Sequence, residues 1–170
     1  YARTTKVYDL VQSFNEKLNE LATVAHLEDA IRKDKNAKAE IEKQAASMTL
    51  YNRNHVDALL AQLPRQEASM ERDIETITNP NSKASYVRRD LRTFRNHPVG
   101  GKPLEMLLAF VKDESRPVDQ RIIATEVLGW YNLYHDKATI IASLKETKAN
   151  DEALKKEIQK SIARLEGKNR

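Results

Sequence analysis

The residues best suited to chemistry in this chain are arginines within one short basic stretch. Arg88, Arg92 and Arg95 recur at steps of four and three residues, which places them on one flank of a single helix. A guanidinium group offers paired, planar donors, so this flank could bind phosphates or acidic side chains bidentately. The alternative is a solvated basic face that Glu and Asp on adjacent helices neutralise.

A second candidate is the aromatic cluster of Trp130, Tyr131 and Tyr134, in a sequence that is only 6% aromatic. Aromatic side chains gathered at one helix end can anchor a protein partner. They can equally cap the core of the last helices, with the indole N–H and the phenol groups reaching water. At the level of sequence both interpretations stay open.

Motifs for catalysis and for cofactor binding do not occur in the sequence. The chain has no Cys, which removes thiolate nucleophiles and cysteine-ligated zinc, and its four His show no spacing typical of a metal site. The glycine pair in Gly100-Gly101-Lys102 is followed by Pro103, whereas a phosphate-binding loop requires Ser or Thr after the Lys. We therefore expect no catalytic residue, no cofactor and no metal, and a protein that is not an enzyme.

The composition favours a helix-rich globular chain. Hydrophobic residues make up 40% and charged residues 32% of its 170 residues, with only four Gly and five Pro. No apolar run approaches the roughly 20 residues that span a bilayer, so we expect a soluble protein. The start at Tyr1 suggests a piece of a longer chain or a mature product. The cytoplasm and, if a leader was removed, the periplasm are both compatible with this sequence.

The N-terminal half predicts helices of uneven length. Apolar residues at steps of three and four predict an amphipathic helix from Thr5 to about Ala30. Its stripe consists of Val7, Leu10, Val11, Phe14, Leu18 and Leu21. A second helix, with Ile41, Ala45 and Met48 on its apolar side, reaches about Tyr51. We expect these two helices to form an antiparallel hairpin.

Three further helices are predicted before the glycine pair. The first is short and stops at Pro64, because proline disrupts a helix interior. A weaker helix with Met70, Ile74 and Ile77 ends in the turn residues 79–82. The last one buries a stripe and ends at His97-Pro98. That stripe is formed by Val87, Leu91 and Phe94.

The segment from Pro103 to Gly129 resembles a HEAT repeat. An apolar helix leads to an acidic turn, and Arg116-Pro117 then opens a second helix that closes on Leu-Gly. The positions that carry the resemblance are Asp113, Pro117, Arg121, Ala124, Leu128 and Gly129. A looser unit covers Lys137 to Gly167 but lacks the turn Pro and the matching Arg.

The resemblance, from about Pro103 to Gly167, implies an all-α protein in which antiparallel helical hairpins stack as a short HEAT-like α-solenoid. We expect a single helical domain over residues 1–170, with an irregular helical part at 1–98 and HEAT-like hairpins at 99–170. The implied function is a non-catalytic scaffold or protein-interaction module, which can be an accessory domain of a larger chain. Its partner would be a protein or a neighbouring domain of the parent chain. Nucleic-acid or acidic-partner binding through the arginine flank is the alternative.

Overall fold

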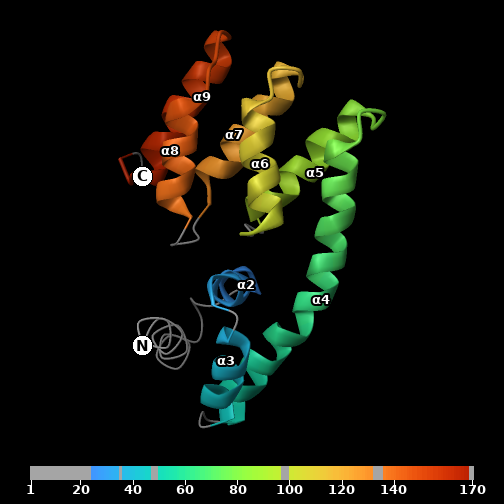
Figure 1. Cartoon of the computed structure of the whole chain (residues 1–170), viewed down its shortest axis with the longest axis vertical. Helices are drawn as coiled ribbons and strands as arrows, with labels where there is room; N and C mark the ends of the chain where they lie inside the picture. The colour runs from blue at the N-terminus through green and yellow to red at the C-terminus, as the bar shows by residue number, and fades with distance from the viewer. Residues whose placement is uncertain (1–23, 35, 47–49, 97–99, 132–135, 169–170) are drawn as a thin grey trace. The chain divides into compact units, whose positions relative to one another are not determined.

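The described part of the chain is built from α-helices alone. The computed structural model describes residues 24–34, 36–46, 50–96, 100–131 and 136–168 (Figure 1), in which no strand occurs. The all-α class predicted from the sequence is confirmed. The helices are α2 (Val24–Lys33), α3 (Ala37–Ala46), α4 (Leu50–Thr78), α5 (Ala84–Asn96), α6 (Lys102–Lys112), α7 (Val118–Gly129), α8 (Lys137–Glu146) and α9 (Glu152–Leu165).

The chain divides into two compact units, residues 1–68 and 69–170, and α4 contributes to both. The sequence predicts a boundary between an irregular part and regular hairpins at residue 98. That boundary falls within the second unit, where α5 packs against α7. The predicted apolar stripe at 7–21 lies outside the described residues, as does Met48. The end predicted at His97-Pro98 is also outside them, and α5 is described as far as Asn96.

The first unit buries a small apolar cluster. Its members come from α2, α3 and the first turns of α4, and Ile31, Leu59 and Leu60 pack against them half-buried. The buried members are Leu27, Ala37, Ile41, Ala45 and Val56. Ile41 and Ala45 are separated by one helical turn, as the sequence pattern predicts for one face of α3.

The predicted helix end at Pro64 is wrong. Helix α4 runs without a break from Leu50 to Thr78 and holds Pro64 in its interior, so it also absorbs the separate helix predicted around Met70. An interior proline lacks the N–H of one helical hydrogen bond and costs about 3 kcal/mol. The helix nevertheless continues through Pro64, which has the good helix formers Ala61, Gln62 and Arg65 on either side.

The helices of the second unit form two rows (Figure 1). Helix α7 contacts both α5 and α9, so these three helices form one row with α7 in the middle. Helix α6 packs on α7, α8 packs on α9, and α6 also contacts α8, which makes α6 and α8 the second row. The core between the rows includes Leu91, Leu107, Leu128, Leu144 and Leu154, all with at most 1% of their surface exposed.

Local sequence signals explain where these helices begin and end. Pro103 stands in the first turn of α6, where its missing N–H costs nothing, and Gly101 before it has the positive φ of 67° that favours glycine. Helix α7 follows Pro117, and Asp119 lies in its positively polarised first turn. In α9 the Asp151 side chain accepts a hydrogen bond from the Leu154 N–H at 3.0 Å.

A buried arginine ties the two hairpins of this unit together. Arg121 on α7 is only 5% exposed. Its Nε donates to the carbonyl of Val111, near the end of α6, at 2.8 Å, and a terminal nitrogen donates to the carbonyl of Lys148 at 3.2 Å. Lys148 belongs to the connection between α8 and α9, so one side chain links the ends of two successive hairpins.

Candidate interaction surface

Two of the three arginines on the flank of α5 are paired with carboxylates of α7. Arg88 lies 3.2 Å from Asp119, and Arg95 lies 3.2 Å from Glu126. Both pairs join residues 31 positions apart, so α5 and α7 run in the same direction and in matching register. For these two arginines the structure confirms the interpretation that acidic residues on an adjacent helix neutralise the basic flank.

The third arginine, Arg92, is exposed and has no ion pair or hydrogen bond within the described residues. Its neighbour Arg89 donates to Asp90 at 2.7 Å, and the Arg89 guanidinium also lies 4.9 Å from the ring centre of Tyr86. Asp90 is 4% exposed. Arg92 is therefore the cation of this flank that remains available to a ligand.

Trp130 is the most exposed large hydrophobic side chain of the described residues, at 47%. The guanidinium groups of Arg95 and Arg164 lie over its ring at 5.0 and 4.9 Å from the centroid. Each cation–π contact of this kind contributes about 0.5–1 kcal/mol at an exposed site. Because Arg164 also pairs with Glu157 at 2.8 Å, side chains from α5 and α9 hold the indole in place at the end of α7.

Tyr131 does not join Trp130 on this surface. Tyr131 is 2% exposed and belongs to the core, which agrees with the core-capping interpretation of the cluster for this residue. Tyr134 lies outside the described residues. The candidate site that the structure brings together therefore consists of Arg92, Arg95 and Trp130, with Arg88 on the same helix flank.

Sequence reasoning missed Arg164, which completes the contacts around Trp130. It stands in the last turn of α9 and is separated from Trp130 by 34 residues, about the length of one helical hairpin in this unit. That spacing is the available signal, because residues one hairpin apart occupy neighbouring positions when hairpins stack.

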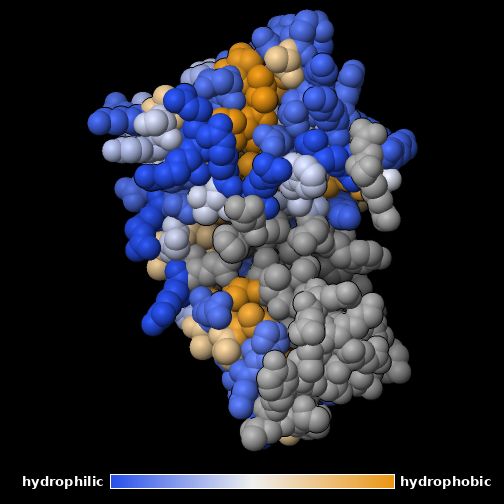
Figure 2. Space-filling view, turned by 180° about the vertical axis from the view of Figure 1, so that it is seen from behind, coloured by the Kyte–Doolittle hydropathy of each residue, from blue (hydrophilic) through white to orange (hydrophobic). Residues whose placement is uncertain are grey.

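Another exposed large hydrophobic side chain lies on the same row of helices. Val118 is 38% exposed at the start of α7, and Ile122 one turn later is half-buried. The reverse face in Figure 2 is largely hydrophilic in its upper part and shows one narrow apolar strip bordered by polar side chains. We call the surface formed by α5, α7 and α9 around Arg92, Val118 and Trp130 the α7 face.

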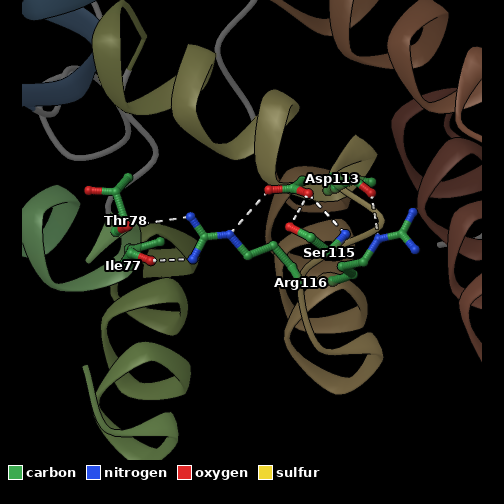
Figure 3. Close-up of polar contacts among 7 residues, drawn as sticks. Ile77, Thr78, Asp113, Ser115 and Arg116 are labelled. Carbon is green, nitrogen blue, oxygen red and sulfur yellow. Dashed lines mark hydrogen bonds and ion pairs between the residues drawn. The ribbon is translucent and has the colours of Figure 1, made fainter. Parts of the chain in front are cut away.

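A groove of about 610 Å³ lies between the last turns of α4 and the length of α6, and Arg116 is among its lining residues. The Arg116 Nε lies 3.3 Å from Asp113, and its terminal nitrogens donate to the carbonyls of Ile77 and Thr78 at 3.3 and 3.4 Å (Figure 3). Hydrogen bonds from Ser115, chiefly from its hydroxyl, together with Arg116 lower the pKa of Asp113. This turn is thus fully engaged in internal contacts.

The carboxylates of Asp73 on α4 and Asp90 on α5 are close enough for their charges to interact. Burial raises the pKa of Asp73, and the nearby Asp90 carboxylate raises it further, against the opposing effects of Arg89 and Arg72. A folded-state pKa above the unfolded value means that the ionised Asp73 destabilises the fold. The wild type consequently recovers stability as the pH falls through this raised pKa.

Asp73→Asn is therefore expected to stabilise the protein at pH 7, by less than about 1 kcal/mol because solvent screens the half-buried carboxylate. The gain over the wild type should shrink as the pH falls and vanish near the unfolded pKa of about 3.9. Thermal unfolding at pH 7 and pH 4 measures both effects. The exposed Asp57, replaced by Asn, is the control, and equal shifts in the two variants would contradict this assignment.

The described residues contain no group of three or more His, Asp or Glu side chains placed to hold a metal ion. None of the helices in the described ranges is long and apolar enough to cross a membrane. Comparison with known proteins finds no family model, no curated protein and no solved structure that matches the chain.

Proposed function

We propose that this chain is a non-catalytic helical-repeat module that binds a protein partner, or a neighbouring domain of its parent chain, on the α7 face. The observation that carries the proposal is Trp130, a large aromatic side chain left 47% exposed and fixed beneath two guanidinium groups. Trp and Arg are the residues most enriched where binding energy concentrates in protein interfaces. A pre-positioned indole loses little side-chain entropy when a partner covers it.

The repeat architecture is supported by the separations at which equivalent helices touch. Contacts from α5 to α7 join residues 31 apart, and one from α7 to α9 joins residues 36 apart. In the second row, Lys112 of α6 meets Glu146 of α8 at a separation of 34. Separations this similar are typical of stacked helical hairpins, whose periods fall between about 30 and 47 residues. Stacks of this kind present extended binding faces.

The charges of the α7 face favour a protein partner over nucleic acid. Arginines alternate there with Asp119, Glu126 and Glu157, all of which form ion pairs on this face. A nucleic-acid backbone is uniformly negative, so these carboxylates would oppose it. Of the three arginines on the α5 flank, only Arg92 has no ion pair within the described residues. A protein surface can match both signs and can also cover Val118 and Trp130.

The test begins by finding the partner and ends by measuring its affinity. The full chain carrying a photo-crosslinking residue at position 92 is expressed in its own cells, and the crosslinked protein is identified and purified. Trp130→Ala should then weaken direct binding at least tenfold, because truncation at such a site costs about 2 kcal/mol or more. Isothermal titration calorimetry with the purified pair measures this loss.

Tyr86→Ala is the matched control, because Tyr86 is 46% exposed and lies under the Arg89 guanidinium in the first turns of α5. It should leave the affinity nearly unchanged. Unaltered binding by the Trp130→Ala variant would remove the proposal. Crosslinking to nucleic acid, with salt-sensitive binding that Arg92→Glu abolishes, would instead establish the alternative function. Arg92 is the informative position because its reversal breaks no ion pair within the described residues.

A further inference from the structure

The groove between α4 and α6 combines an apolar floor with a negative rim. Half-buried Ile74 and Met106 and buried Phe110 line it, and the Arg116 guanidinium lies 5.0 Å from the ring centre of Phe110. A volume of about 610 Å³ is within the range of sites that enclose small ligands or a few side chains. The groove is therefore large enough to receive a short peptide segment.

The carboxylates on its rim are not neutralised by the protein. Glu71, Glu75 and Glu105 are exposed and line the groove, and within the described residues their side-chain carboxylates form no ion pair or hydrogen bond. Glu71 and Glu75 are one helical turn apart, an arrangement of like charges that destabilises a helix by about 0.2–0.5 kcal/mol. Among the cations, Arg116 is already held by Asp113, which leaves Lys102 alone against three glutamates.

We propose that this groove is a second binding site, which takes a basic peptide segment whose aliphatic side chains enter the floor. Lysines or arginines of that segment, one helical turn apart, would meet Glu71 and Glu75 and relieve their mutual repulsion. Glu105 supplies a third carboxylate from α6. The same carboxylates would repel an anionic ligand, so the groove favours a basic segment.

The test uses the full chain and a fluorescein-labelled peptide of lysine and leucine, with leucines at helical spacing, in a low-salt anisotropy titration. The wild type should bind it, and the same peptide with glutamate in place of lysine should not bind. Glu71→Gln/Glu75→Gln should weaken binding roughly three- to tenfold, as expected for the loss of two exposed ion pairs. Both positions are exposed, so the fold should be preserved, and circular dichroism checks this.

Glu42→Gln/Asp57→Asn is the matched control, because it changes the net charge equally at exposed residues that do not line the groove. It should bind the peptide as the wild type does. An equal loss in both double variants would overturn the proposal, since binding would then follow net charge alone. Failure of the wild type to bind would also overturn it. Trp130→Ala should leave peptide binding intact, which separates this outcome from that at the α7 face.

Discussion

Replacing Arg121 by alanine should destabilise the second unit by about 2–4 kcal/mol, because the substitution removes hydrogen-bond donors from buried backbone carbonyls. The Arg121 side chain is 5% exposed, and the hydrogen bond from its Nε to the Val111 carbonyl at 2.8 Å is buried. In the variant the carbonyls of Val111 and Lys148 lose this donor. The lost packing of the aliphatic stem adds to the cost.

Urea unfolding followed by tryptophan fluorescence measures this effect in the right unit, since Trp130 is the chain's one tryptophan. Arg121→Met separates the two contributions, because methionine keeps much of the stem and supplies no donor. The stability of the Arg121→Lys variant should lie between those of the wild type and the alanine variant, because an ammonium group cannot reproduce the planar donors of the guanidinium.

Arg116 is the matched control for this experiment. It also bonds to helix-terminal carbonyls, but it is 25% exposed and its contacts with Ile77 and Thr78 are longer, at 3.3 and 3.4 Å. Arg116→Ala should therefore cost less than about 1 kcal/mol. If it cost as much as Arg121→Ala, burial would not be what makes the Arg121 contacts important.

The α6–α7 hairpin could be predicted from sequence because its signals are local. Pro103, Asp113 and Pro117 mark a helix start, a turn and a second start within fifteen residues, and each acts through its own backbone. The buried stripe of α5 is likewise local, and Leu91 and Phe94 are both at most 1% exposed. The resemblance to HEAT repeats remains a prediction that rests on these same positions.

Features that depend on how helices pack could not be predicted in this way. The carboxylates that neutralise Arg88 and Arg95 lie 31 residues later, and only the register of α5 against α7 identifies them. Tyr131 and Trp130 are adjacent in sequence, yet one is 2% and the other 47% exposed. At Pro64 the error had the opposite origin, because a strong local signal predicted a helix end where α4 continues.

Helix α7 lies between α5 and α9, so residues on both sides of it contact a neighbouring helix. One part of its surface pairs with α5 through Asp119 and Glu126, and another meets α9, where the Ser161 hydroxyl donates to the Thr125 carbonyl at 3.1 Å. The helix ends beside Trp130, so any displacement between α7 and α9 would also move the indole relative to Arg164. A substitution that disturbs the packing of α7 on α9 should therefore lower stability and also alter the α7 face.

Gly129→Val should be the most destabilising substitution at this contact, with a cost of about 3 kcal/mol. A Cβ atom at position 129 would lie 2.5 Å from the Oγ, 2.6 Å from the Cβ and 2.9 Å from the Cα of Ser161. The last contact involves backbone, so α9 itself must shift. Gly129→Ala should cost less, because alanine's better helix propensity offsets about 1 kcal/mol of the clash. Urea unfolding monitored by Trp130 fluorescence measures both.

A double-mutant cycle with Ser161→Gly tests whether this contact is the cause. Removing the Ser161 side chain eliminates the two shorter contacts but leaves the one to Cα, so Gly129→Ala/Ser161→Gly should cost about 1 kcal/mol less than the sum of the single variants. Gly167→Ala is the control: its Cβ would meet nothing within 4 Å, and only its φ of 74° would be strained. Strictly additive costs in the cycle would show that the Ser161 side chain is not the reason why position 129 must be glycine.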